Sequence, residues 1–194
     1  MKQSALILAA LGFLLPWASL ARADGRDPAM SPASVDSPST PRRSPEFVVH
    51  LANGKEMLLS SFRGKVVALM FVHTTCPVCQ QASQIFSKLY ADYGERGFQP
   101  VVVAFNSQAN LYVPEFVRKF DLRYPVGFSS VEDVAAYLDF PAGERFTIPQ
   151  IVWIDGSGFI RNATPLKGDE NRLTETCWRS RIDSLLKEQS EAPE

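Results

Sequence analysis

The chain has 194 residues, of which 45% are hydrophobic, and this is enough for one compact domain with a sizeable core. Its 20 Lys and Arg residues against 21 Asp and Glu residues give a formal net charge of -1. Such a balance provides no positive field that would attract nucleic acid or an anionic membrane surface. We therefore expect no nucleic-acid partner, and partners that are selected by local chemistry.

The first residues have the pattern of a secretory signal peptide. One early cation, Lys2, precedes an apolar run from Ala5 to Leu15, and Ala21-Arg22-Ala23 is a small-x-small cleavage signal. We predict that residues 1–23 are removed during export, to the periplasm or beyond. The alternative is an uncleaved membrane anchor, which fits less well because the apolar segment is shorter than the roughly 20 residues that a spanning helix needs.

Residues 24–45 are rich in Pro, Ser, Asp and Ala and contain few large apolar side chains. Such a segment buries too little surface to offset the entropy lost on ordering, so it is predicted to be a flexible linker. The folded domain is predicted to occupy residues 46–190.

The domain begins with a predicted hairpin, in which residues 47–51 and 56–59 flank the turn signal Asn53-Gly54. Residues 66–72 form an unbroken apolar run, which is typical of a central strand covered on both faces. Residues 78–93 repeat apolar side chains at helical spacing up to Gly94, and residues 100–105 form a second buried strand. Together these segments predict a right-handed strand-helix-strand unit.

The rest of the chain continues the alternation of helices and strands. We expect a helix that opens at Pro114, with Phe116, Val117 and Phe120 facing inward. The further predicted elements are a short strand at 124–128, a helix at 131–138, a strand at 150–154, a turn at 155–158, its hairpin partner at 159–161 and a final helix from about 170 to 188.

Two of the three cysteines, Cys76 and Cys79, lie three positions apart where the first central strand gives way to its helix. A cysteine at the start of a helix has its thiolate stabilised by free backbone N–H groups and by the helix dipole. Cys76 occupies that place, with Pro77 at the first helical position. Cys79 lies one turn further on, so we predict that Cys76 attacks a partner sulfur and that Cys79 resolves the mixed disulfide.

A metal site is the competing interpretation of the cysteine pair. Structural zinc needs four Cys or His ligands, and the chain offers the three cysteines, His50 and His73 without a second paired motif. Copper(I) held by the two cysteines and one histidine, or a purely structural disulfide, stays open. The redox interpretation is favoured because export places the cysteines where disulfides persist, and we expect no metal and no cofactor.

The chain resembles the thioredoxin superfamily, and within it the exported TlpA-like and redoxin-like (AhpC/TSA-type) thiol-disulfide oxidoreductases. The resemblance covers about residues 46–188 and rests on the segment SFRGK (61–65), the Cys-Pro-Val-Cys motif, the segment FTIPQIVWIDGSG (146–158) and the closing amphipathic helix. It implies an α/β thioredoxin-like fold. This fold has a central mixed β-sheet flanked by helices, an N-terminal hairpin and an extra strand-helix insertion before a cis-proline.

The resemblance also implies the roles of further site residues. Pro149 matches the family's cis-proline, which faces the cysteines and leaves the backbone of Ile148 free to pair with an extended substrate segment. By the same resemblance the residues flanking the nucleophile contact substrate; these are Thr75, Pro77 and Val78.

The chain departs from the family pattern at two positions. Thr75 replaces the tryptophan that thioredoxins place before the first cysteine, and Met70 replaces a buried acid that accepts the proton of the resolving thiol. Glu56 or His73 could supply that acceptor. His73 could also favour the thiolate of Cys76 if it were close and protonated, although a histidine at a strand end more often only bonds the loop.

The function predicted from these residues is an exported thiol-disulfide oxidoreductase that reduces disulfides of other exported proteins. By resemblance its electrons come from a membrane thiol donor. We expect the protein to act as a monomer. One alternative is a redoxin-type peroxidase, although His73 stands where the peroxidase motif has a threonine. Another is a copper-binding thioredoxin-like chaperone. The third cysteine, Cys177, is expected to be a half-buried free thiol on the last helix.

Overall fold

The computed structural model of the chain describes residues 41–141, 147–165, 168 and 173–191. The predicted signal peptide and the linker up to residue 40 lie outside the described residues, as does the beginning of the segment FTIPQIVWIDGSG. No helix in the described part of the chain combines the length and the apolar character needed to cross a membrane.

The described strands form one mixed sheet with the order β1-β8-β7-β4-β5-β6-β2-β3. The central strand β4 pairs in parallel with β5 and antiparallel with β7, and β5 pairs in parallel with β6. The strands are β1 (Arg42–Arg43), β2 (Val48–His50), β3 (Glu56–Leu58), β4 (Val66–Val72), β5 (Phe98–Ala104), β6 (Val126–Phe128), β7 (Gln150–Ile154) and β8 (Phe159–Ala163). The predicted hairpin at the start of the domain is confirmed as the antiparallel pair β2 and β3.

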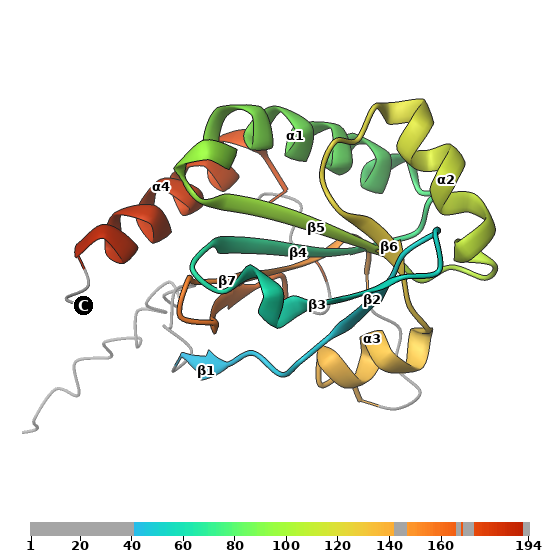
Figure 1. Cartoon of the computed structure of the whole chain (residues 1–194), viewed down its shortest axis with the longest axis horizontal. Coiled ribbons are helices and arrows are strands. Elements are labelled where there is room, and N and C mark those ends of the chain that lie inside the picture. Colours follow the sequence, from blue (N-terminus) through green and yellow to red (C-terminus); the bar gives the residue numbers. More distant parts are fainter. Residues whose placement is uncertain (1–40, 142–146, 166–167, 169–172, 192–194) are drawn as a thin grey trace, which may run out of the picture. The chain divides into compact units, whose positions relative to one another are not determined.

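Helices cover both faces of this sheet, as Figure 1 shows. The first, second and fourth helices lie on one face, and the third lies on the other. They are α1 (Pro77–Tyr93), α2 (Ala109–Phe120), α3 (Val131–Tyr137) and α4 (Glu175–Glu191), with short 3-10 turns at Leu59–Phe62 and Gly94–Arg96. The predicted strand-helix-strand unit is confirmed as β4-α1-β5.

The core is divided by the sheet into two layers, because successive side chains of a strand point to opposite faces. All seven residues of β4 are buried. Met70 belongs to the layer under α1, α2 and α4, together with Phe86 and Trp178. Leu69 belongs to the opposite layer, where it is grouped with Val134 of α3. The unbroken apolar run of β4 thus reflects a strand covered on both faces.

The domain begins earlier than its composition suggests. Arg42 and Arg43 pair antiparallel with β8, although both fall in the segment expected to be linker. Ser44 is buried, and its hydroxyl lies 2.8 Å from the hydroxyl of Tyr137 on α3. These polar residues are therefore held by backbone pairing and one buried hydrogen bond. Neither interaction leaves an apolar pattern in the sequence.

The predicted start of α2 at Pro114 is wrong, because the helix begins at Ala109 and contains Pro114 in its interior. The helix buries Ala109, Val113 and Phe116, so tertiary packing on both sides of the proline outweighs the backbone hydrogen bond that the proline cannot donate. The final helix begins at Glu175 rather than near residue 170, and residues 169–172 lie outside the described part.

Candidate active site

Cys76 is the N-cap residue of α1, directly after the loop that follows β4. Its backbone is extended, and its Sγ accepts a hydrogen bond from the backbone N–H of Cys79 at 3.4 Å. Pro77 fills the first helical position, where a missing N–H costs nothing. The sulfur is partly exposed and lies where free N–H groups and the helix dipole favour a negative charge. The predicted position of Cys76 at the start of the helix is confirmed, and its role as nucleophile stays a prediction.

Cys79 is fully buried one turn further along α1. Burial, together with the neighbouring Cys76 sulfur, raises the pKa of the Cys79 thiol far above its ordinary value. The Cys79 thiol therefore keeps its proton at neutral pH when both cysteines are reduced, as they are in this structure. The two cysteines differ in the way expected of a nucleophile and a resolving thiol: Cys76 is partly exposed and Cys79 is buried.

The loop before Cys76 is held from two sides by side chains that the sequence did not single out. The Oδ1 atom of Asn106, just after β5, accepts hydrogen bonds from the backbone N–H of Thr74 at 2.9 Å and from its hydroxyl at 3.3 Å. The Nε2 atom of Gln80 donates to the Thr74 carbonyl at 2.8 Å. The sequence could have indicated Gln80, because it directly follows Cys79. It could not have indicated Asn106, because Asn106 comes close to Thr74 only through the pairing of β4 with β5.

Pro149 and Ile148 lead into β7 at the same edge of the sheet as the cysteines. The Ile148–Pro149 peptide is cis, as predicted. Gln150 is paired with Phe71, near the end of β4, so the two residues before it lie beside the segment that leads to Cys76. Ile148 is partly buried and packs against the same apolar layer as Cys76. The fold thus brings together parts of the chain that are more than 70 residues apart in the sequence.

Comparison with known proteins shows the family to which a chain with this cysteine pair belongs. A family model described as Redoxin matches residues 41–175, which is more than half of the chain. The chain belongs to the Redoxin family.

Its relatives fit this assignment. A thiol-disulfide oxidoreductase ResA of Bacillus thuringiensis subsp. konkukian is 33% identical over 108 residues, or 55% of this chain. That match spans 62% of the relative's length. A ResA of Geobacillus kaustophilus is 30% identical over 138 residues, covering 69% of this chain and 75% of the relative. These comparisons support the predicted place of this Redoxin chain in the thioredoxin superfamily.

A solved structure supports the fold. A thiol:disulfide interchange protein, thioredoxin family protein, from Chlorobium tepidum TLS is similar with a TM-score of 0.64 and 23% identity. The similarity covers 76% of this chain and 98% of that chain. The predicted thioredoxin-like fold of this Redoxin-family chain is therefore confirmed.

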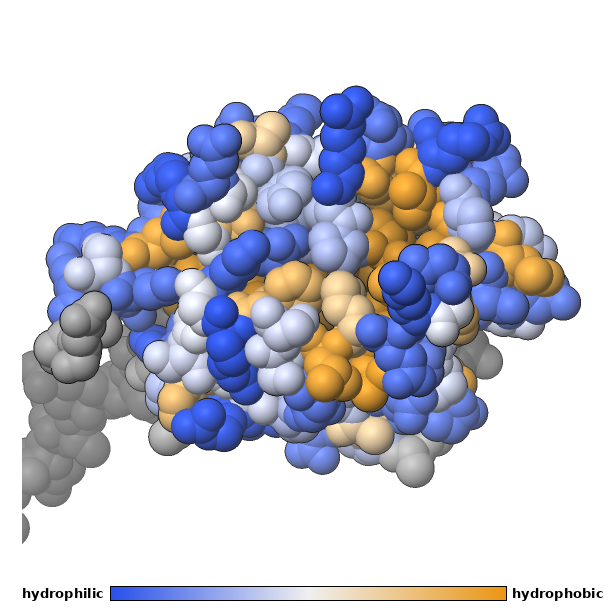
Figure 2. All heavy atoms as spheres, viewed as in Figure 1, coloured by the Kyte–Doolittle hydropathy of each residue, from blue (hydrophilic) through white to orange (hydrophobic). Residues whose placement is uncertain are grey.

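The residues around Cys76 in this Redoxin domain are open to solvent. Thr75, Pro77 and Val78 are all exposed, with 50% of Val78 accessible. Leu111 and Tyr112, in the first turn of α2, are also exposed large hydrophobic residues. Apolar surface shows beside α2 on the face drawn in Figure 2. An apolar, accessible surface at the sulfur suits contact with another polypeptide better than with a small ion.

Of the two predicted substitutes for the missing buried acid, Glu56 does not fit that role. Glu56 lies on β3, which is separated from β4 by three strands, or about 19 Å at ordinary strand spacing. It pairs instead with His50 at 3.4 Å. Burial lowers the pKa of His73, so its imidazole is neutral at pH 7, and its ring packs edge-on against Phe105. A neutral imidazole brings no positive charge to Cys76 but can accept a proton, so His73 as acceptor for the Cys79 thiol stays a prediction. Met70, at the family's acid position, is buried in the core.

The third cysteine and the histidines do not join the pair in a metal site. Cys177 is a half-buried free thiol near the start of α4, packed against the core, as expected from its sequence position. In the described part of the chain, no three His, Cys, Asp or Glu side chains are placed together so as to hold a metal ion. The copper hypothesis therefore finds no support in the described geometry.

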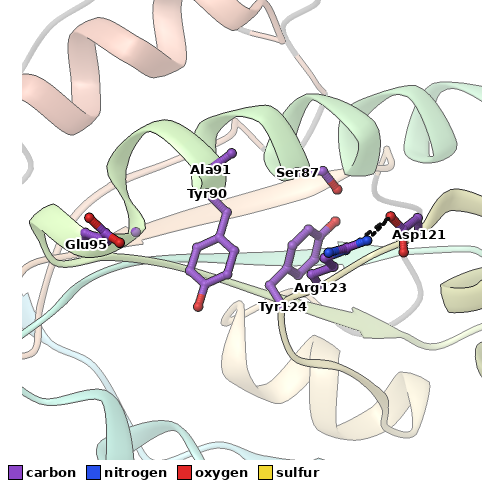
Figure 3. A pocket seen from close by; sticks show the side chains of 8 residues that line it. Ser87, Tyr90, Ala91, Glu95, Asp121, Arg123 and Tyr124 are labelled. Carbon is purple, nitrogen blue, oxygen red and sulfur yellow. Dashed lines mark hydrogen bonds and ion pairs between the residues drawn. The ribbon is translucent and has the colours of Figure 1, made fainter.

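Two hollows of this Redoxin domain differ in their relation to the cysteines. One of about 650 Å³ lies between α1 and the segment after α2, and Figure 3 shows Tyr90 and Tyr124 on its wall. It begins at Ser87, eight residues or about 12 Å along α1 from Cys79, and its Arg123 is paired with Asp121 at 3.0 Å. A smaller hollow of about 150 Å³ adjoins the cysteine loop and is lined by Thr75 together with Thr74, Gln80, Tyr112, Glu115, Phe116, Lys119 and Phe120.

Proposed function

We propose that this protein is a thiol-disulfide oxidoreductase that reduces disulfides of other exported proteins. The observation that carries the proposal is the contrast between Cys76, partly exposed at the start of α1, and Cys79, buried one turn away. The family and the printed names of its ResA relatives agree with this chemistry. We propose reduction rather than oxidation because the exported thiol-disulfide oxidoreductases that the chain resembles receive their electrons from a membrane thiol donor.

The reaction begins at the exposed sulfur. The Cys76 thiolate attacks one sulfur of a substrate disulfide, so that a Cys76–substrate disulfide forms and the other substrate sulfur leaves as a thiolate, which takes up a proton. The hydrogen bond from the Cys79 N–H and the helix start stabilise the attacking thiolate. The buried Cys79 thiol does not compete in this step, because its raised pKa keeps it protonated.

The second step returns the substrate as a dithiol. Once the Cys76 sulfur is bonded to the substrate it carries no negative charge that disfavours a Cys79 thiolate. Cys79 then gives its proton to a base, for which we propose the neutral imidazole of His73, and attacks the Cys76 sulfur of the mixed disulfide, which releases the second substrate thiolate and leaves a Cys76–Cys79 disulfide. Two electrons have then passed from the protein to the substrate. A dithiol donor, proposed to be a membrane protein, must reduce the Cys76–Cys79 disulfide before the next turnover. We propose that the protein works as a monomer with no cofactor and no metal.

Substrate contact is proposed for the exposed residues beside the sulfur and for the strand edge opposite it. Thr75, Pro77 and Val78 are open to solvent around Cys76. The backbone of Ile148, before the cis Pro149, lies at the same end of the sheet and can pair with an extended segment that carries the substrate cysteine. The partners are thus thiol- or disulfide-containing proteins whose cysteine lies in an extended, accessible segment.

The cellular setting of the proposal comes from the first residues. Residues 1–23 are proposed to direct export and to be cleaved, with an uncleaved anchor as the alternative, and the linker then tethers or trails the domain. An exported setting suits this chemistry, since disulfides persist outside the cytosol. The peroxidase alternative gains nothing from the site, because His73 is neutral and packed against Phe105 where the peroxidase motif has a threonine.

Trapping the mixed disulfide tests the proposed order of attack. The Cys79→Ala variant lacks the resolving sulfur, so incubation with a disulfide-bonded protein such as insulin should yield a covalent adduct that dithiothreitol releases. Mass spectrometry of the digested adduct should place the linkage at Cys76. The Cys177→Ser variant on the Cys79→Ala background is the control and should trap equally well. An adduct through Cys177, or no adduct, would contradict the proposal.

A further inference from the structure

The loop that presents the nucleophile is pinned by a side chain from the neighbouring strand. Cys76 donates its backbone N–H to the His73 carbonyl at 3.1 Å, so the segment 73–76 is a tight turn. Thr74 lies in the middle of this turn and is buried, with 5% of its surface accessible. Its N–H and its carbonyl point away from the turn to two different partners, Asn106 and Gln80.

Asn106 is itself held rigidly. The Phe105 N–H donates to the Val72 carbonyl at 3.1 Å, which extends the parallel pairing of β4 and β5 by one residue. The Asn106 carbonyl accepts the N–H of Ala109 at 3.0 Å, and its Nδ2 donates to the Ser107 carbonyl at 3.1 Å. Because Nδ2 is used in that bond, Oδ1 is the atom that faces Thr74, and the orientation of the amide is fixed by its bonds.

Gln80 completes the clamp from the other side. It follows Cys79 on α1, and its Nε2 reaches back to the Thr74 carbonyl at 2.8 Å. The loop is thus tied to the sheet by Asn106 and to the helix by Gln80. The hydrogen bonds of both side chains in the described part of the chain go to Thr74 and Ser107, so both act on Cys76 by way of the Thr74 peptide.

We propose that Asn106 and Gln80 are positioning residues for the thiol-disulfide reaction. Together they hold the Thr74 peptide so that the Cys76 sulfur stays at the helix N-cap, within reach of the Cys79 N–H. A thiolate gains more from that position than a disulfide sulfur does, since the N–H groups and the helix dipole act on charge. The clamp therefore stabilises the reduced pair over the oxidised pair. This inference rests on the proposed function of the same site.

The consequence of losing the clamp follows from the burial of Thr74. Without Oδ1 of Asn106 the Thr74 N–H is left inside the protein without its partner, which is costly, so the loop moves to find water. That movement takes the Cys76 sulfur away from the helix start. The reduced form then loses stabilisation and the equilibrium shifts toward the disulfide.

The test is the equilibrium constant of the Cys76–Cys79 pair against glutathione, measured on the full chain by alkylation trapping. Asn106→Ala should shift it at least about tenfold toward the protein disulfide, which is about 30 mV for a two-electron couple. Gln80→Ala should shift it in the same direction. The double variant should shift it by less than the product of the two single effects, because both residues hold one peptide.

Matched controls separate positioning from general destabilisation. Asn110→Ala and Gln81→Ala replace the same residue types at exposed positions close by on α2 and α1, and should stay within about twofold of the wild type. Circular dichroism checks whether each variant is folded. If Asn106→Ala does not fold, Gln80→Ala tests the proposal.

The outcomes distinguish this role from the function on which it rests. If the wild-type pair shows a reversible couple but Asn106→Ala and Gln80→Ala match their controls, the positioning role alone is overturned. Strictly multiplicative effects in the double variant would likewise overturn a shared clamp. A wild-type pair without any reversible couple would overturn the proposed function and this role with it.

Discussion

Replacing Cys76 with serine is expected to abolish catalysed disulfide reduction while leaving the fold intact. A serine hydroxyl is not ionised at neutral pH and cannot form the mixed disulfide, so turnover of insulin with dithiothreitol should fall by on the order of 10³ or more, to the uncatalysed rate. Serine is also a favoured N-cap residue, so α1 should still begin at Pro77. The thermal midpoint should therefore change little.

Two matched variants give this result its meaning. Cys177→Ser changes the same residue type on α4, outside the site, and should keep full turnover. Cys79→Ala should lose turnover but keep the first step, because only the resolving sulfur is missing. Residual turnover in Cys76→Ser above a few per cent of the wild type would contradict the assignment of Cys76 as the nucleophile. An inactive Cys177→Ser variant would show that the third cysteine takes part.

Replacing Phe86 with alanine is expected to cost about 3–5 kcal/mol of the free energy of unfolding, the usual range for a buried phenylalanine. The Phe86 side chain is fully buried on α1. Its ring centroid lies 5.0 Å from that of Trp178 on α4, 6.4 Å from Phe98 on β5 and 6.5 Å from Trp153 on β7. The ring thus joins the helix that carries the cysteines to the sheet and to the last helix, and its loss leaves a cavity among large aromatic side chains.

Urea unfolding of the reduced chain measures this effect. Tyr112→Ala removes an aromatic ring that is 45% exposed on α2, and is expected to cost under about 1 kcal/mol. Because domains of this size are stable by only about 5–15 kcal/mol, Phe86→Ala should lower the midpoint of unfolding strongly. A cost of less than about 1 kcal/mol for Phe86→Ala would mean that the aromatic cluster does not anchor α1.

The parts of the fold that the sequence predicted are those with a continuous apolar signal. The unbroken run at residues 66–72 and the helical spacing of 78–93 both match the structure closely, because burial on two faces and burial on one face leave different patterns. Arg42 and Arg43 carry no such pattern, since their strand is held by backbone pairing with β8. The start of α2 was predicted wrongly at Pro114, because the preference of proline for the first turn of a helix was outweighed by packing.

The site divides in a similar way. The spacing of Cys76 and Cys79 and the strand-to-helix boundary were enough to predict where each cysteine lies on the helix, because these positions depend on local helix geometry. Asn106 could not be found by the same reasoning, because its bond to Thr74 joins residues 32 apart through strand pairing. Glu56 was considered as a proton acceptor only because the order of strands in the sheet is not visible in the sequence.

The equilibrium reduction potential of the Cys76–Cys79 pair tests the central claim most directly. It is measured in thiol-disulfide buffers of defined composition, with both forms of the protein trapped by alkylation. A reversible two-electron couple near or below roughly -230 mV is the result expected for a reductant of exported proteins. A couple at roughly -120 to -180 mV would instead mark an oxidant or isomerase, and the absence of any reversible couple would contradict thiol-disulfide exchange at this site.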